Sequence, residues 1–287
     1  MRVAVVGARG QLAAAVVREC AETHDVVAFD HSELDVVDDG AVAAAMERAR
    51  PDVIVNGAAF NDVDAAEDHP VDALNLNTFA VRALARAARA QGATLVHYSS
   101  DFVFDGKASE PYTEDHPPNP QSFYAASKLL GEWFALDAPR AYVLRVESLF
   151  GRAPGAGPEK GSLAFIVKTL MAGGSPNVFA DRTVSPTYVI DAARATRQLL
   201  ETGAAGGLYH CVNSGCCTWL ELAQEVARQL GEPEWKARLV PVRMSEVDLK
   251  AARPRYCALS NDKLRSVGVD MPPWQDALER YLAGVRT

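Results

Sequence analysis

The feature that most constrains the fold is a regular alternation of short β-branched runs with longer alanine-rich runs through the first half of the chain. The apolar runs predict strands at residues 3–6, 26–30, 53–56, 94–100 and 141–146. The alanine-rich runs between them predict helices at residues 11–22, 40–49, 71–91 and 122–136. Continuously apolar strands separated by helices indicate a parallel sheet covered on both faces. The expected fold class is therefore α/β, with a doubly wound parallel sheet.

The second half is less regular and predicts a smaller α/β lobe packed on the first domain. A glycine- and proline-rich loop covers residues 151–161, and a strand is expected at 177–180. Periodic apolar positions predict helices at residues 162–173, 187–201, 218–230 and 274–283. We expect the larger domain to comprise residues 1–150 and about 177–210, and the smaller lobe to comprise 151–176 and about 211–287.

Charge and cysteine content exclude several classes of protein. The net charge of −8 gives no general attraction for nucleic acid or for an anionic membrane surface, so neither is an expected partner. The five cysteines are odd in number and form no CxxC pair, which favours free thiols in a reducing compartment. The apolar run at the N-terminus is too short for a signal peptide. The expected location is cytoplasmic.

A glycine loop after the first predicted strand points to a dinucleotide. Gly7, Gly10 and Ala13 form G-x-x-G-x-x-A at the start of the first helix, where a tight turn and free N–H groups accept a pyrophosphate. Asp30 closes the second strand, where a Rossmann domain places an acid on the adenosine ribose. Further expected cofactor contacts lie in the loop, after the second and third strands, and on the next helix: Arg9, Gln11, Leu12, Asp35, Val36, Ala58, Ala59 and Asn77.

The choice between NADH and NADPH stays open from the sequence. A carboxylate at Asp30 favours NADH because it repels a 2′-phosphate, whereas Arg9 in the loop favours NADPH because it can pair with that phosphate.

A Y-x-x-x-K motif supplies the catalytic hypothesis. Tyr124 and Lys128 lie at positions i and i+4 of a predicted helix, so they share one face. Reduction of a carbonyl needs a hydride from the cofactor and a proton for the new alkoxide, and Tyr124 can act as that general acid. A nearby ammonium from Lys128 is expected to lower the pKa of the phenol. Ser100, at the carboxyl end of its strand, is expected to polarise the carbonyl oxygen.

With these motifs in place, the chain resembles the extended short-chain dehydrogenase/reductase superfamily and, within it, the dTDP-4-dehydrorhamnose reductase family. The matching stretches run nearly the length of the chain and include GARGQLA at 7–13, HYSSDFVFDG at 97–106, YAASK at 124–128, SPTYVIDAA at 185–193 and ARPRYCALS at 252–260. The resemblance implies an NAD(P)H-dependent oxidoreductase of deoxysugar biosynthesis. Its substrate would be a nucleotide-activated deoxysugar with a 4-keto group, such as dTDP-4-dehydrorhamnose.

The resemblance also implies roles for particular residues. The catalytic set would be Ser100, Asp101, Tyr124 and Lys128, with Tyr124 and Lys128 also touching the cofactor. The smaller lobe would bind the sugar nucleotide. Substrate contacts are expected from Val103, Phe104, Ser148, Arg182, Trp219 and Arg253, and Arg145 is a further candidate for phosphate contact.

Two departures from the family pattern bear on the substrate and on metals. Ser148 stands where many members carry a tryptophan near the sugar, so the identity of the sugar stays open. Some members bind magnesium through glutamates where this chain has Ala14-Ala15 and Tyr188-Val189, so no metal site is expected. That difference also leaves a homodimer open, because the metal links the dimer in some relatives.

Two other functions are compatible with the fold. A sugar-nucleotide epimerase or dehydratase shares the fold, but dehydratases usually have a glutamate after the aspartate, where this chain has Phe102. A non-catalytic dinucleotide-binding subunit, similar to the regulatory subunit of methionine adenosyltransferase, is disfavoured by the intact serine, tyrosine and lysine.

Overall fold

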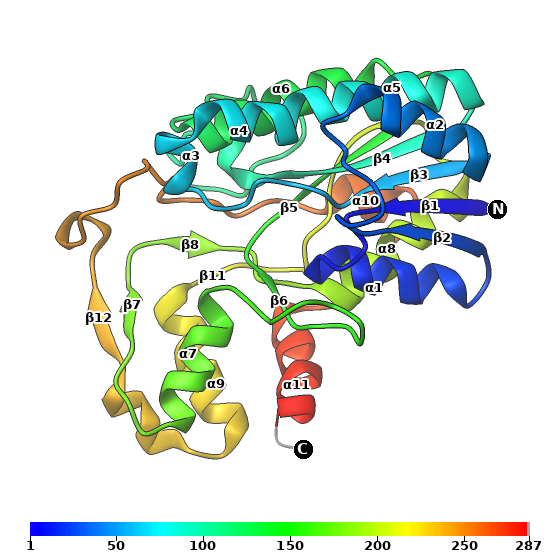
Figure 1. The fold of residues 1–287 in the computed structure, drawn as a ribbon. Helices are drawn as coiled ribbons and strands as arrows, with labels where there is room; N and C mark the ends of the chain where they lie inside the picture. The colour runs from blue at the N-terminus through cyan, green and yellow to red at the C-terminus, as the bar shows by residue number, and fades with distance from the viewer. Residues whose placement is uncertain (286–287) are drawn as a thin grey trace.

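A six-stranded parallel sheet forms the centre of the larger domain in the computed structural model, which describes residues 1–285 (Figure 1). The strand order is β10-β5-β4-β3-β1-β2. The strands are β1 (Arg2–Val6), β2 (Asp25–Phe29), β3 (Val53–Asn56), β4 (Thr94–Ser100), β5 (Ala141–Val146) and β10 (Gly207–His210). This sheet confirms the predicted α/β class.

Helices cover both faces of the sheet, because successive side chains of each strand enter opposite cores. Val3 and Val5 of β1 pack in one hydrophobic cluster, whereas Ala4 and Val6 pack in another. On the first face lie α1 (Gln11–Ala21) and α8 (Val189–Thr202); on the second lie α2 (Asp39–Ala49), α5 (Ala80–Gln91) and α6 (Phe123–Leu136) (Figure 1).

The helix predicted over residues 71–91 is interrupted. It consists of α4 (Pro70–Leu74), a π-helical turn (Asn75–Phe79) and α5, and a short α3 (Ala65–Asp68) precedes it. The amide of Asn77, in the π turn, holds the backbone N–H and C=O of Phe60 and donates to the hydroxyl of Ser127 on α6. These contacts give a physical reason for the widened turn, a feature that often lies next to functional sites.

The smaller lobe combines helices with short paired strands. Its elements are α7 (Ser162–Met171), β7 (Asn177–Phe179), β8 (Thr183–Val184), β11 (Cys217–Thr218), α9 (Trp219–Leu230) and β12 (Val240–Val242). β7 pairs with β12 and β8 pairs with β11, so residues 177–184 lie with this lobe, whereas α8 and β10 pack on the main sheet. β6 (Leu149–Phe150) pairs with β9 (Thr187–Tyr188), where the chain crosses between the two parts.

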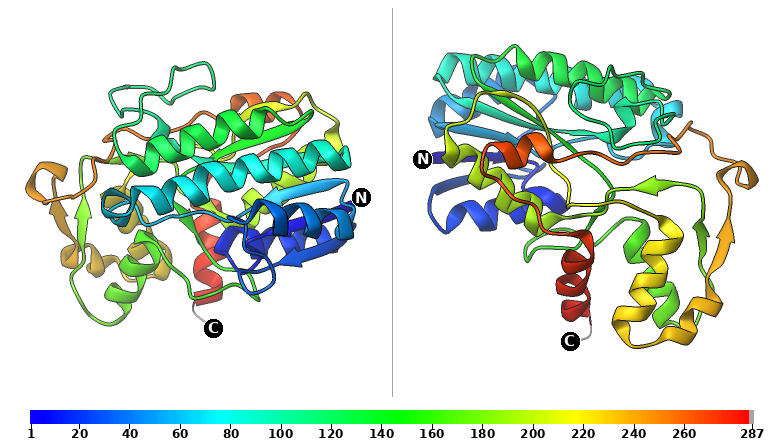
Figure 2. Two further views of the ribbon diagram at one scale, coloured as in Figure 1. Left: turned by 45° about the horizontal axis from the view of Figure 1, so that its top comes forward. Right: turned by 180° about the vertical axis from the view of Figure 1, so that it is seen from behind.

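After β12 the chain returns to the larger domain, as Figure 2 shows. There α10 (Asp262–Ser266) contributes Leu264 to the core of the main sheet. 3-10 turns span Asp101–Val103, Pro233–Arg238 and Met244–Glu246.

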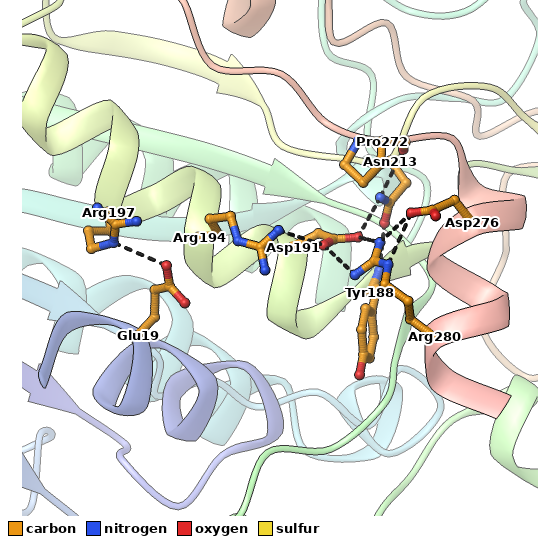
Figure 3. A network of polar contacts seen from close by, with 9 residues as sticks. All are labelled: Glu19, Tyr188, Asp191, Arg194, Arg197, Asn213, Pro272, Asp276 and Arg280. Carbon is orange, nitrogen blue, oxygen red and sulfur yellow. Dashed lines mark hydrogen bonds and ion pairs between the residues drawn. The ribbon is translucent and has the colours of Figure 1, made fainter. Parts of the chain in front are cut away.

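The C-terminal helix α11 (Trp274–Val285) is attached to α8 by a charged network (Figure 3). Arg280 donates to both oxygens of Asp191 at 2.8 and 2.7 Å and also pairs with Asp276 at 2.9 Å. The Asp191 side chain is only 1% exposed and accepts a further bond from Asn213. A buried carboxylate held in this way fixes the helix against the domain junction, since an unpaired charge there would be costly. No helix within residues 1–285 is both long and apolar enough to span a bilayer.

Candidate active site

The first βα loop provides a close approach for a phosphate-bearing ligand. Gly7 has a φ of +71°, and a Cβ at this position would lie 2.7 Å from the backbone nitrogen of Ala58. Gly10 precedes α1 and offers no side-chain cap, so the first N–H groups of the helix have no side-chain acceptor. A positive helix end with free donors suits a pyrophosphate. The residues present therefore fit a dinucleotide.

Arg9 and Asp30 face each other beside this loop. The Arg9 guanidinium lies 3.7 Å from the Asp30 carboxylate, and the Arg9 side chain is 74% exposed. A hydrogen bond from the Ser32 hydroxyl, with smaller help from Arg9, holds the pKa of Asp30 below its usual value. The carboxylate that favours NADH and the guanidinium that favours NADPH thus lie side by side.

The other predicted cofactor residues are divided between the loop surface and the core. Ala58 and Ala59 come directly after the loop glycine that follows β3, and both are half-buried. The Ala58 N–H donates to the side-chain oxygen of Asn56. Gln11 is committed to the Gly151 carbonyl at 2.6 Å. Leu12 and Val36 are core residues, each 7% exposed. Asp35 accepts the N–H of Val37.

The catalytic triad predicted from sequence comes together at the carboxyl end of β4. Ser122 caps α6 by accepting the N–H of Ala125, which begins the helix one residue before Tyr124. The Ser100 hydroxyl lies near enough to the Tyr124 hydroxyl to favour its ionised form. Lys128, one helical turn further on, donates to the Tyr98 carbonyl of β4 at 2.6 Å. All three predicted side chains are at most 8% exposed.

Burial dominates the electrostatics of this group and corrects one expectation. The pKa of Tyr124 is raised well above its usual value, because desolvation outweighs the opposite effect of the nearby Ser100 hydroxyl. The prediction that Lys128 lowers this pKa is wrong, since the lysine amine is directed to the Tyr98 carbonyl instead. Burial also lowers the pKa of Lys128 to about 8. Tyr124 is therefore protonated at neutral pH, which is the state a general acid needs before it can donate.

A buried ion pair lies next to Lys128. Arg145 on β5 binds Glu132 on α6 through two hydrogen bonds of 2.8 and 2.7 Å, and Glu132 also accepts the hydroxyl of Ser99. The Arg145 side chain is 3% exposed. Arg145 is therefore committed to the core, and the suggestion that it contacts a phosphate is wrong.

The predicted substrate residues do not all reach one surface. Trp219 lies in the hydrophobic core of the smaller lobe, and Val103 and Phe104 are buried in a separate cluster in which Phe104 stacks on Tyr112. Arg253 forms a bidentate pair with Asp64 at 2.9 and 2.8 Å. Arg182 lies over the ring of Phe102, which in turn packs edge-on to Tyr124.

Ser148 adopts a left-handed backbone with a φ of +43°, uncommon for a residue other than glycine. It lies next to Glu147, whose carboxyl group is buried near Asp101. At the positions where the family resemblance pointed to magnesium ligands, Ala14 and Ala15 lie in the core and Tyr188 stacks on Phe150.

A cavity of about 730 Å³ opens between the loop that follows β4 and the smaller lobe. Its lining includes Lys107, Asp181, Arg253, Arg255 and Tyr256. Lys107 and Arg255 were not singled out from the sequence, although each lies within or directly after a stretch that carries the family resemblance. Their positive charge within or beside these stretches was the sequence signal that could have identified them.

Comparisons with known proteins show the family of this chain. The family described as RmlD substrate binding domain matches residues 1–287. A probable dTDP-4,6-dihydroxy-2-methyloxan-3-one 4-ketoreductase of Streptomyces antibioticus is 38% identical, with 97% of this chain and 93% of the relative covered. A dTDP-4-dehydrorhamnose reductase of Burkholderia thailandensis is 33% identical over 97% of each chain. The crystal structure of a dTDP-4-dehydrorhamnose reductase of Bacillus anthracis in complex with NADP has a TM-score of 0.91, with 32% identity over 99% of each chain.

Proposed function

This chain belongs to the RmlD substrate binding domain family, and from that premise we propose that it reduces the 4-keto group of a dTDP-activated 4-keto-6-deoxysugar. It is an NAD(P)H-dependent oxidoreductase, as its reductase relatives and the NADP-bound structural neighbour support. The observation that carries the proposal is the buried set of Ser100, Tyr124 and Lys128 gathered at the carboxyl end of β4.

The cofactor would be held by residues from three loops. Gly7 and Gly10 at the start of α1 receive the pyrophosphate, and Asp30 with Arg9 receives the adenosine ribose. When bound, NADPH or NADH supplies the hydride that reduces the keto carbon. Ala58, Ala59 and Asp35 line the same side of the sheet as further proposed contacts.

Side chains of the protein orient the keto oxygen of the substrate and supply its proton. The Ser100 hydroxyl orients the keto oxygen, and Tyr124 donates its proton to that oxygen as negative charge develops. The amine of Lys128 positions the site by donating to the Tyr98 carbonyl of β4, and it is a proposed contact of the bound cofactor. Burial of all three side chains excludes water and strengthens these interactions.

The cavity beside the smaller lobe is the proposed seat of the nucleotide diphosphate. Lys107 and Arg255 are the proposed phosphate partners because they line it with exposed cationic groups. Arg253 and Arg182 complete this side, the first anchored by Asp64 and the second reaching toward Phe102. We keep the division into a dinucleotide domain and a sugar-nucleotide lobe as a proposal, with residues 177–184 assigned to the lobe on the basis of their strand pairing.

A cytoplasmic location and a homodimer are further proposals. All five cysteines are free, which supports a reducing compartment. Light scattering on the purified protein measures the mass in solution, and a mass equal to one chain would rule out the homodimer.

The test of function is a turnover assay. Purified enzyme mixed with reduced nicotinamide and a dTDP-4-keto-6-deoxysugar should consume the nicotinamide absorbance and yield one alcohol per cofactor oxidised. Binding of the dinucleotide without turnover of any 4-ketosugar would favour the non-catalytic alternative. Exchange or elimination without net oxidation of the cofactor would favour an epimerase or dehydratase.

A further inference from the structure

Two carboxyl groups meet beside the catalytic serine, brought together by the register of β4 and β5. Ser100 pairs with Val146 across these strands, so the next residues, Asp101 and Glu147, leave the sheet side by side. A carboxyl oxygen of each and the sulfur of Cys257 all lie within 4.8 Å of one another. Asp101 is 3% exposed and Glu147 is 2% exposed.

The contacts of the pair do not support two ionised carboxylates. Glu147 accepts the N–H of Ser185 through Oε2 at 2.5 Å, and the Ser148 hydroxyl lies 3.5 Å from Oε1. Asp101 accepts the Ser100 hydroxyl through Oδ1 at 2.9 Å. Oδ2 of Asp101 is buried without a donor among residues 1–285, because the Cys257 thiol donates to the carbonyl of Pro254. A buried carboxylate oxygen without a donor is costly when charged but tolerable when the group is neutral.

The charges around the pair are also unbalanced. Within residues 1–285, Arg182 is the one cation that faces both acids, and its guanidinium is directed toward the Cys257 sulfur at 3.7 Å and over Phe102. The other titratable groups that face the acids are neutral at pH 7, because burial raises the pKa of each: Tyr124, Cys216, Cys217, Tyr256 and Cys257. Desolvation likewise raises the pKa of Asp101 and, together with the neighbouring Asp101, that of Glu147. With two acids and one cation, the electrically neutral state of this site retains one proton.

We propose that Asp101 and Glu147 share one proton at neutral pH, and that Asp101 returns it through the Ser100 hydroxyl to Tyr124 after each reduction. The inference rests on the proposed ketoreductase function. It assigns Glu147 a positioning role, since Glu147 acts only by keeping Asp101 protonated.

The proton balance closes without a further reactant. After Tyr124 gives its proton to the substrate oxygen, the phenolate takes the proton of the Ser100 hydroxyl. In the same movement the Ser100 oxygen takes the proton that the Asp101 carboxyl carries on Oδ1. The new Asp101 carboxylate then accepts the Ser100 hydroxyl at Oδ1, as in the bond described above, and is stabilised by Arg182. No electrons are transferred in this relay. Solvent later restores the proton to the pair, which supplies the one proton that each carbonyl reduction consumes.

The direct test is infrared spectroscopy of the enzyme without substrate. At pH 7 the wild type should show the C=O stretch of a protonated carboxyl group. Glu147→Gln and Asp101→Asn should each abolish it, because the remaining acid then faces Arg182 alone and ionises. Glu147→Asp should retain the band. Glu19→Gln is the matched control, since this glutamate of α1 is paired with Arg197 of α8 and its replacement should leave the band unchanged. A wild type without the band at pH 7, or a band that survives in either single variant, overturns the inference.

Kinetics give the second test. Glu147→Gln should move the alkaline limb of the kcat profile down by about one pH unit, which lowers kcat about tenfold at a fixed alkaline pH, with KM for the nucleotide sugar unchanged. A raised KM with an unmoved pH profile would mark a structural role and reject the relay. The two readouts separate the hypotheses. The infrared band without any turnover would support the shared proton and reject the proposed function. Turnover without the band would support the proposed function and reject the shared proton.

Discussion

Lys128 should reduce the stability of the protein while it serves the reaction, and replacing it with methionine tests this. Burial lowers its pKa from 10.5 to about 8, a shift of about 2.5 units. At about 1.36 kcal/mol per unit, the charged amine costs the apo-protein about 3 kcal/mol at neutral pH. Lys128→Met removes that cost but also removes the hydrogen bond to Tyr98, worth about 1 kcal/mol. The expected net effect is a stabilisation of about 2 kcal/mol.

The stability difference between the variant and the wild type should depend on pH. Between the folded pKa of about 8 and the unfolded value of 10.5, the unfolded chain binds more protons at Lys128, so the wild type gains stability as the pH rises. The advantage of the methionine variant is therefore complete below pH 8 and shrinks as the pH approaches 10.5.

Chemical denaturation of both proteins without cofactor, at neutral pH and again at high pH, measures the difference. The variant should also lose ketoreductase activity. A variant less stable than the wild type at neutral pH, or an advantage that does not change with pH, would refute the reasoning.

The remaining predictions concern catalysis, cofactor choice, folding and metals. Tyr124→Phe should keep dinucleotide binding, measured by fluorescence titration, but lower kcat by about 10²–10⁴-fold; unchanged turnover would reject its role as acid. Arg9→Ala should raise KM for NADPH more than KM for NADH, because Arg9 is the cation beside Asp30; equal changes would remove Arg9 from the 2′-phosphate site. Arg280→Ala should lower the free energy of unfolding by about 3–5 kcal/mol, because it leaves the carboxylate of Asp191 buried without its main partner; a loss below about 1 kcal/mol would contradict this. Activity should survive a divalent-metal chelator, and inactivation reversed by magnesium would contradict the prediction that no metal is bound.

Local patterns in the sequence were sufficient to predict most of the larger domain. Strands 53–56, 94–100 and 141–146 were predicted with the bounds that the structure has, because apolar runs buried on both faces are unambiguous. The helix over 71–91 was predicted as continuous, whereas the amide of Asn77 bonds to Phe60 and Ser127 within a π turn. Those contacts join segments distant in sequence, so periodicity could not reveal them.

Substrate residues were harder to predict than catalytic ones. Tyr124 and Lys128 lie one turn apart on any α-helix, so their pairing follows from the sequence alone. Trp219 and Arg253 were chosen by resemblance, but burial in the smaller lobe and pairing with Asp64 decide what these side chains contact.

The sequence by itself determined three features: the succession of strands and helices along the chain, the glycine turn, and the one-turn spacing of Tyr124 and Lys128. Each depends on residues close together in the chain. The tertiary structure decided the rest. Asp101 and Glu147 become neighbours only through the register of two strands, and Arg182 and Cys257 reach them only when the smaller lobe folds back. Burial then sets the charge of each group, and burial is a property of the packed protein and not of any segment.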